Sequence, residues 1–316
     1  MEGPTVLCPG EVYTLTVTQE DHEIRLDTFL TQEFRGYTRS LFKKLIEEKA
    51  ITINEKVARK AGAIIRENDT VAIIVPRVKP KKILEEEEIE QLNVQLIHQN
   101  KEFAIINKPA GLITHPPHSA SDEVSVIDWV THRFKDIEEV GYKDRPGIVH
   151  RLDKETSGLM VIPLTKEAHE IFSDMFKYKT IQKTYLAVVC GHTEKEGVID
   201  FPIGRHKVVR NKMTHRLDGR ASTTRYKMKQ YFNEHTFVEA YPETGRTHQI
   251  RVHFTTLGHP LVGDKMYGKN THLIKRQALH ASEIEFVFKN KPYHFTSPLP
   301  GDFNNLITLL KKALLF

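Results

Sequence analysis

Cysteine is scarce in this chain, which has 316 residues and only two cysteines, Cys8 and Cys190. They lie far apart and no CxxC pair occurs, which argues against a disulfide framework and against a structural zinc site. No apolar run is long enough to cross a membrane, and residues 1–11 have neither the basic nor the apolar region of a secretory signal. We therefore expect a reduced, cytoplasmic protein.

Motifs of several large enzyme classes are also missing. There is no GxGxxG, no glycine-rich phosphate loop with an Asp-Phe-Gly, and no HExxH. His248 and His253, like His115 and His118, lack the spacing of zinc ligands, so we expect hydrogen-bonded or solvated histidines. The sequence therefore predicts no metal site.

Basic residues are present in a modest excess, +5 overall, but they are clustered. Between Arg35 and Lys60 there are eight Lys and Arg against three Glu, and between Arg205 and Lys229 there are nine against the single Asp218. Clusters of this kind favour a polyanionic partner, and nucleic acid is the usual one. Two solvated faces are the alternative interpretation.

The first of these clusters falls in a small predicted α+β domain, residues 22–80. Apolar residues recur at helical spacing over 24–34 and again on one face of a second helix after Thr38. Residues 51–57 and 71–75 have the composition of strands, separated by turn residues.

This small domain resembles the S-four RNA-binding domain, named after a ribosomal protein. The residues that carry the resemblance are Arg25-Leu26-Asp27, Phe29-Leu30, Arg39-Ser40, Lys49, Ile53-Asn54 and Asp69. The resemblance implies that basic residues of the second helix, Arg39, Lys43 and Lys44, contact RNA phosphates. A generic basic α+β module is the alternative.

A charged segment separates this domain from the rest of the chain. The sequence RVKPKK is followed directly by EEEEIE, with few apolar residues between positions 77 and 93. Abrupt charge blocks with proline are typical of linkers, so we place a linker at 81–93 and a second domain at 94–316. Strands and helices mix in this second domain without regular βαβ alternation, which favours an α+β fold.

The most informative stretch is HRLDKETSGL, residues 150–159. Its triplet Arg-Leu-Asp occurs three times in the chain, ending at Asp27, Asp153 and Asp218, so the triplet alone indicates nothing. Only Asp153 is followed by a Thr-Ser-Gly turn that enters an apolar strand, 159–164. A rigid strand behind the turn can position a carboxylate with the precision that catalysis requires, so Asp153 is the predicted catalytic residue.

Several ordered blocks extend this signal. HRLDKETSGL, KTYLAVVCG (183–191) and GRTHQIRVHFTTLGHPLVGDKMYG (245–268), with NKPAGL from residue 107 and LHA from 279, resemble the RluA/RluD family of RNA pseudouridine synthases. The resemblance covers residues 95–300. It implies an α+β catalytic domain with a mixed, largely antiparallel sheet. It also implies isomerisation of uridine to pseudouridine in RNA without a cofactor or a metal. We expect the substrate to be large-subunit ribosomal RNA and the protein to be a monomer.

The resemblance also implies roles for individual residues. Asp153 would supply an ionised carboxylate, either attacking the anomeric carbon or acting as a base at the 2′ position of the sugar. A cation is needed to keep it ionised in a dry pocket; Arg251 is the first candidate and Arg246 the second. Tyr185 would stack on uracil and assist a proton transfer.

Two further residues complete the implied site. Arg151 would fill the space of a uridine that has left its stack, and Ile250 would line the uracil pocket. One departure from the family pattern is Pro163-Leu164, where the family has Ala and Lys; we expect the strand to end at Pro163 with catalysis intact.

Other functions remain open. A non-catalytic RNA-binding or ribosome-assembly factor on the same fold would bind RNA without isomerising it. A transfer RNA pseudouridine synthase would perform the same chemistry on another RNA, and an RNA-directed hydrolase would leave abasic sites instead.

Overall fold

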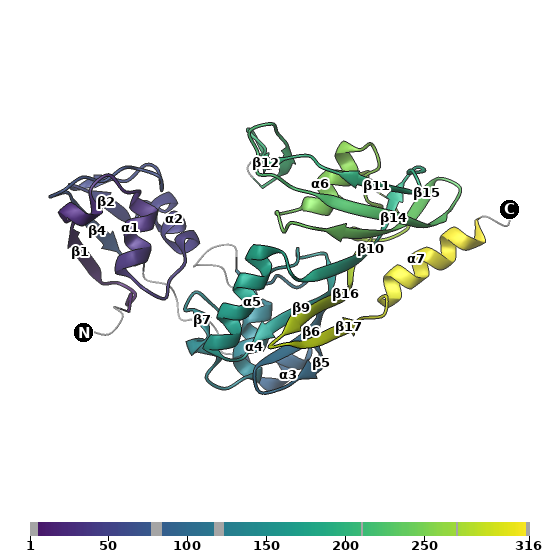
Figure 1. The fold of residues 1–316 in the computed structure, drawn as a ribbon, viewed down its shortest axis with the longest axis horizontal. Helices are drawn as coiled ribbons and strands as arrows, with labels where there is room; N and C mark the ends of the chain where they lie inside the picture. The colour runs from purple at the N-terminus through teal and green to yellow at the C-terminus, as the bar shows by residue number, and fades with distance from the viewer. Residues whose placement is uncertain (1–5, 77–83, 117–122, 210, 270, 314–316) are drawn as a thin grey trace. The chain divides into compact units, whose positions relative to one another are not determined.

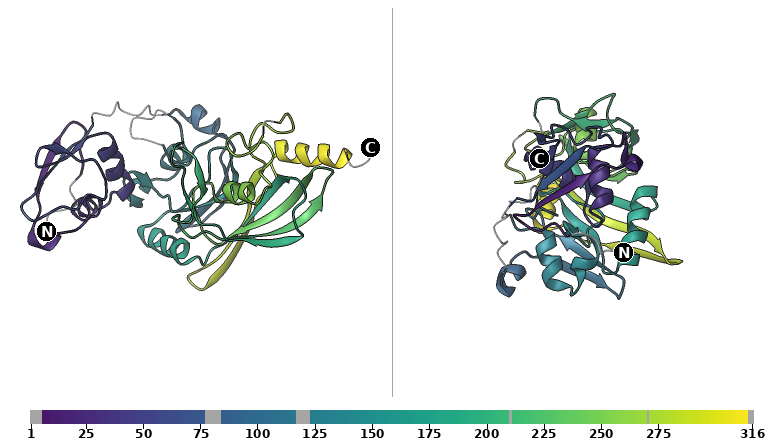
Figure 2. Two further views of the ribbon diagram at one scale, coloured as in Figure 1. Left: turned by 90° about the horizontal axis from the view of Figure 1, so that it is seen from above. Right: turned by 90° about the vertical axis from the view of Figure 1, so that its left-hand side faces the viewer.

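The computed structural model describes residues 6–76, 84–116, 123–209, 211–269 and 271–313 (Figures 1 and 2). By their contacts these fall into two compact units, residues 1–86 with 115–148 and residues 87–114 with 149–316. The linker at 81–93 stays a prediction, because residues 77–83 lie outside the described residues and Glu86–Glu90 form a short helix, α3, with Ile89 buried. None of the helices described is both long enough and apolar enough to cross a membrane.

The first unit contains a four-stranded antiparallel sheet in the order β1-β4-β2-β3. Its strands are β1 (Val12–Thr16), β2 (Ile51–Ile53), β3 (Lys56–Val57) and β4 (Thr70–Ile74), and its helices are α1 (Leu26–Glu33) and α2 (Arg39–Glu47). Leu26 and Phe29 of α1 are buried with Phe42 of α2 and Val71 of β4. The two helices and the strands that the sequence predicted here are confirmed.

The other elements of this unit are short. They are the 3-10 turns η1 (Gln19–Asp21) and η2 (Ile137–Glu139), the helix α4 (Val126–Arg133) and the paired strands β7 (Gly141–Tyr142) and β8 (Arg145–Pro146). The helix α4 begins at a capping box, in which Ser125 and Asp128 bond each other's backbone N–H groups.

The second unit is built on a nine-stranded sheet in the order β11-β14-β15-β10-β16-β9-β6-β5, with β17 also paired to β16 (Figure 1). Every strand pair is antiparallel except β16 with β9. The prediction of a mixed, largely antiparallel α+β domain is therefore confirmed. The strands are β5 (Gln95–Gln99), β6 (Phe103–Lys108), β9 (Ser157–Pro163), β10 (Gln182–Cys190), β11 (Glu196–Ile199), β14 (Thr224–Tyr231), β15 (His235–Pro242), β16 (Leu279–Phe288) and β17 (Lys291–Thr296).

Three helices cover parts of this sheet: α5 (Lys166–Tyr178), α6 (Gln249–Thr256) and α7 (Gly301–Lys312). Phe172 of α5 packs in a cluster of rings with Phe103 of β6 and Phe286 of β16. Phe254 of α6 packs against β14 and β15, and Phe303 of α7 lies fully buried in a third cluster. The helices α5 and α7 each bury one apolar face, as the 3.6-residue period of their sequences predicts. The helix α6 is instead buried continuously from Gln249 to Phe254, polar residues included.

Two predictions about this unit have opposite outcomes. The strand β9 ends at Pro163, as expected from the proline. The expectation that residues 204–229 form a single basic insertion is wrong. Part of it forms a small hairpin of β12 (Ile203–Arg205) and β13 (Met213–His215), and Thr224–Tyr231 are strand β14 of the main sheet. Basic residues that alternate along β14 concealed its period of two, because their outward-facing side chains dominate the composition.

Candidate active site

The predicted catalytic stretch forms a loop that leads into β9. The N–H of Thr156 donates to the carbonyl of Asp153 at 3.0 Å, which closes the turn directly before the strand. Gly158 follows with a φ of +123°, and a Cβ atom there would lie 2.2 Å from the carbonyl oxygen of Ala281. This glycine lets the start of β9 pair in parallel with β16. The Thr-Ser-Gly turn distinguished Asp153 in the sequence. Its glycine is required because the backbone of Ala281 approaches it closely.

A buried lysine side chain holds the loop by hydrogen bonds. Lys108, at the end of β6, has no exposed surface and donates to the carbonyls of Pro109, Leu112 and Lys154 at 2.8, 2.7 and 3.1 Å. Burial lowers the pKa of Lys108 to about 7, against the charge of Asp153, which acts to raise it. The NKPAGL segment therefore anchors the loop of Asp153.

An ion-pair chain runs from this loop into the protein. Nη1 of Arg251, on α6, donates to Oδ2 of Asp153 at 2.9 Å. Nε and Nη2 of the same guanidinium donate to the two oxygens of Asp264 at 2.7 and 3.0 Å. Burial alone would lower the pKa of Arg251, but the hydrogen bonds to Asp264 and the charge of Asp153 raise it above its usual range. The contact predicted between Arg251 and Asp153 is present, and Arg251 stays charged beside the carboxylate.

Asp264 was not singled out by its sequence pattern. Its side chain has no exposed surface, and it accepts two further hydrogen bonds, from the N–H groups of Met266 and Tyr267 at 3.0 and 3.1 Å. A carboxylate that accepts two hydrogen bonds from one guanidinium fixes the rotamer of that arginine. Asp264 therefore determines which nitrogen of Arg251 is left to bind Asp153.

His248 also lies close to Asp153. Its Nε2 lies 3.9 Å from Oδ2 of Asp153, and its Nδ1 lies 2.8 Å from the hydroxyl of Tyr267. That hydroxyl also accepts from the N–H of Met213 at 2.8 Å. When the hydroxyl donates its proton to Nδ1, the proton of neutral His248 sits on Nε2 and faces Asp153. Burial lowers the pKa of His248, which favours this neutral form.

Two of the four histidines with unfavourable zinc spacing, His248 and His253, are hydrogen-bonded, as expected, and His118 lies outside the described residues. His253 is buried and bonds Thr224 Oγ1 and the carbonyl of Phe201 at 2.9 and 3.1 Å. His248, in contrast, lines the same cavity as Asp153, which the sequence did not indicate.

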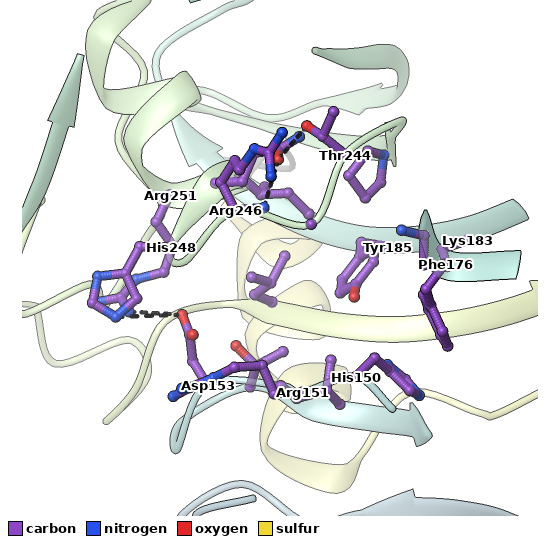
Figure 3. A pocket seen from close by; sticks show the side chains of 17 residues that line it. His150, Arg151, Asp153, Phe176, Lys183, Tyr185, Thr244, Arg246, His248 and Arg251 are labelled. Carbon is purple, nitrogen blue, oxygen red and sulfur yellow. Dashed lines mark hydrogen bonds and ion pairs between the residues drawn. The ribbon is translucent and has the colours of Figure 1, made fainter. Parts of the chain in front are cut away.

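Asp153 lies at one end of a cavity of about 100 Å³ that is partly open to solvent (Figure 3). Oδ2 of Asp153 binds Arg251, whereas Oδ1 accepts no hydrogen bond from any residue that the structure describes. That oxygen is available to a substrate. The residues that line the cavity are His150, Arg151, Leu152, Asp153, Thr156, Phe176, Lys183, Tyr185, Pro242, Thr244, Gly245, Arg246, His248, Gln249, Ile250, Arg251 and Leu279.

Six of the predicted site residues line this cavity: Asp153, Tyr185, Arg251, Arg151, Ile250 and Arg246. Tyr185 projects from β10, and burial, reinforced by the charge of Asp153, raises its pKa well above the usual range. Its hydroxyl is therefore protonated at neutral pH. Nε of Arg246 donates to the carbonyl of Ala221 at 3.1 Å, so the second candidate for a cation beside Asp153 is directed elsewhere.

The other three predicted residues belong to the first unit. Arg39 binds the buried carboxylate of Asp27 at 2.8 Å, Lys43 is exposed, and burial lowers the pKa of Lys44. Their contact with RNA phosphates stays a prediction.

One group among the described residues has the geometry of possible metal ligands. Glu283 and Glu285 of β16 lie beside His294 of β17, with ligand atoms within 4.8 Å of one another. None of the three lines the cavity of Asp153.

Comparison with known proteins gives two family matches. Residues 102–256 match the family described as RNA pseudouridylate synthase, and residues 24–71 match the S4 domain. An uncharacterized RNA pseudouridine synthase of Aquifex aeolicus is 35% identical over 82% of this chain and 82% of its own length. A ribosomal large subunit pseudouridine synthase D of Pseudomonas aeruginosa is 33% identical over 91% of this chain and 92% of its own length.

Solved structures show the same fold. Human RNA pseudouridylate synthase domain containing 1 has a TM-score of 0.56 and 25% identity, and covers 69% of this chain and 87% of its own. Human RNA pseudouridylate synthase domain containing 4 has a TM-score of 0.57 and 24% identity, and covers 71% and 95%.

Proposed function

This chain belongs to the RNA pseudouridine synthase family, and we propose that it isomerises specific uridines of large-subunit ribosomal RNA to pseudouridine. The choice of RNA is supported by relatives named ribosomal large subunit pseudouridine synthase D, which match over more than nine tenths of this chain. The S4 domain at the N-terminus supports an RNA partner. As part of the same proposal, the protein acts as a monomer in the cytoplasm, which light scattering and cell fractionation test.

The observation that carries the proposal is the ion-pair chain from Asp153 through Arg251 to Asp264 at the end of a cavity. Arg251 binds Oδ2 of Asp153 and leaves Oδ1 free for the substrate. In the reaction the bond from C1′ to N1 of uracil breaks and its electron pair stays on the ring. The ring then turns, C5 bonds to C1′, the C5 proton leaves, and N1 takes up a proton. Atoms and charge balance, because product and substrate are isomers.

Asp153 acts in one of two ways in this scheme. Its carboxylate either attacks C1′ and forms an ester, or removes a proton from C2′ of the sugar. Both require an ionised carboxylate with one free oxygen, and both place the ribose next to Asp153. Tyr185 and Ile250 then hold the uracil, and Arg151 occupies the space that the uridine leaves in the RNA.

The decisive experiment follows the C5 proton. RNA labelled with tritium at C5 of uridine is incubated with wild type or with Asp153→Asn, and released tritium is counted. Asp153→Asn should fold, because Arg251 keeps its bidentate pair with the buried Asp264. We expect release by wild type and a loss of at least about 10³-fold in the variant with RNA affinity retained. Equal release by both proteins would refute the enzymatic role of Asp153.

The competing functions give different results in the same experiment. A non-catalytic RNA-binding factor releases no tritium in either form, and a hydrolase leaves abasic sites that stop primer extension. The RNA target is decided by mapping pseudouridines in a strain without the gene. A uridine that stays unmodified in large-subunit ribosomal RNA supports the proposal, and one in transfer RNA contradicts it.

A further inference from the structure

One cation in the cavity has no counter-ion. Lys183 lies on β10, two residues before Tyr185, and lines the same cavity. Within the part of the chain that the structure describes, its ammonium forms no ion pair and no hydrogen bond. The contact it does make is with the ring of Phe176, whose centre lies 5.9 Å from Nζ.

The other cations around the cavity have partners. Arg251 is shared between two carboxylates, Arg246 donates to a backbone carbonyl, and the buried ammonium of Lys108 has three carbonyls. Lys183 is half-buried, so its unpaired charge is partly withdrawn from water. Burial is the sole cause that lowers the pKa of Lys183, to about 8, and no carboxylate opposes it. An anionic group of the substrate would supply the missing partner.

Lys183 also lines a second hollow with Glu239, Glu243, Glu283 and Glu285, but within the described residues it forms no ion pair with any of them. On the side of the Asp153 cavity its neighbours are uncharged. His150 stacks on Phe176 with ring centres 4.5 Å apart, and its Nε2 accepts from the N–H of Val161 at 2.9 Å. Burial and then the charge of Lys183 lower the pKa of His150 to about 3, so it is neutral. Tyr185 is protonated as well. This end of the cavity is therefore an aromatic wall that carries one positive charge.

The direction of the cavity indicates which part of the substrate reaches Lys183. Figure 3 shows Asp153 and His248 at one end, and Lys183, Phe176 and His150 at the other, with Tyr185 between them. With the ribose at Asp153, the uracil extends past Tyr185 toward Lys183. The uracil ring is also the part that becomes negative, because the electron pair of the broken bond is delocalised onto its carbonyl oxygens.

We propose that Lys183 is a further catalytic residue, whose ammonium donates a hydrogen bond to a carbonyl oxygen of uracil and stabilises the ring while it is detached from C1′. This inference rests on the proposed function. The ammonium keeps its proton throughout, and its contribution ends when C5 bonds to C1′ and the ring loses its negative charge. A fixed hydrogen-bond donor is effective because it does not have to reorganise when the negative charge develops.

The test combines a charge-removing variant with a change in the leaving group. Lys183→Met keeps the length of the side chain without its charge, and Lys183→Arg keeps the charge. The matched control is Lys177→Met, which removes a lysine that lies over the ring of Tyr178 at 4.7 Å and does not line the cavity. A short RNA spanning the mapped target carries either uridine or 5-fluorouridine, whose fluorine makes the detached ring a more stable anion.

The readouts are the single-turnover rate at which the intact N1-glycoside disappears, and the Kd for RNA. We expect Lys183→Met to slow the reaction of uridine by about 10²-fold, to slow that of 5-fluorouridine clearly less, and to leave Kd unchanged. Lys183→Arg should recover part of the rate, and Lys177→Met should behave as wild type.

Other outcomes overturn the inference. Equal slowing of both substrates, or a weaker Kd with a smaller salt dependence, means that Lys183 contacts a phosphate. Unchanged rates mean that it is a solvated side chain. If the wild type itself isomerises no uridine, the proposed function fails, whereas a variant that reacts like an active wild type overturns the role of Lys183 alone.

Discussion

Removing the guanidinium of Arg251 should separate its structural role from its catalytic role. Arg251→Met deletes three hydrogen bonds, at 2.9 Å to Asp153 and at 2.7 and 3.0 Å to Asp264. Asp264 then remains a charge without exposed surface, held only by the N–H groups of Met266 and Tyr267. Breaking a buried ion pair in this way costs about 3–5 kcal/mol of unfolding free energy.

The double variant Arg251→Met/Asp264→Asn removes the buried charge together with its partner. The remaining cost is that of imperfectly satisfied neutral groups, about 1–3 kcal/mol, so the double variant should be more stable than Arg251→Met. Activity should not recover, because Asp153 still lacks the guanidinium that orients its carboxylate. We expect both variants to be slower than wild type by about 10²–10⁴-fold.

Chemical denaturation of the full chain and tritium release from RNA labelled at C5 of uridine measure the two effects. Leu306→Ala is the stability control, because Leu306 is a fully buried residue of α7 and does not line the cavity. This variant should lose about 2–5 kcal/mol of unfolding free energy. Its rate well below the thermal midpoint should equal that of wild type. The reasoning is refuted if the double variant regains activity together with stability, or if Leu306→Ala is slowed as much as Arg251→Met.

Two further predictions concern the packing behind the Asp153 loop. Gly158→Ala should destabilise the chain by about 3 kcal/mol or more, because the new Cβ meets the carbonyl of Ala281. The control Gly301→Ala, which has open space around it, should shift the thermal midpoint little. Equal thermal midpoints for the two variants would contradict the argument. Burial lowers the pKa of His280 to about 4 from 6.5, so its neutral form contributes stability that is fully present above pH 6.5 and is lost as pH falls toward 4. In this window wild type should lose up to about 1.4 kcal/mol of unfolding free energy per pH unit. The variant His280→Asn, which retains an acceptor for Ser157, should lose less stability as the pH falls. If both proteins lose stability equally with pH, another group causes the effect.

Local sequence patterns predicted several of the elements and one half of the site. Apolar spacing predicted α1 and α2, because a helix that buries one face must repeat with its own period. The Thr-Ser-Gly turn before an apolar strand distinguished Asp153 from two other aspartates in the same triplet. The partner Arg251 was identified from family resemblance and not from periodicity, because the two residues are 98 positions apart.

Tertiary structure alone decided the other half. Asp264 and Tyr267 lie in the matched block 245–268. Nothing in their spacing shows that Asp264 binds the guanidinium of Arg251 or that the hydroxyl of Tyr267 bonds Nδ1 of His248. Lys183 looks like an ordinary strand residue in the sequence, and only the surrounding aromatic wall makes it an unpaired charge. The physical reason is the same in each case. A period in the sequence records which side of an element is buried, whereas hydrogen-bond partners and lost hydration depend on elements that the fold brings together from distant parts of the chain.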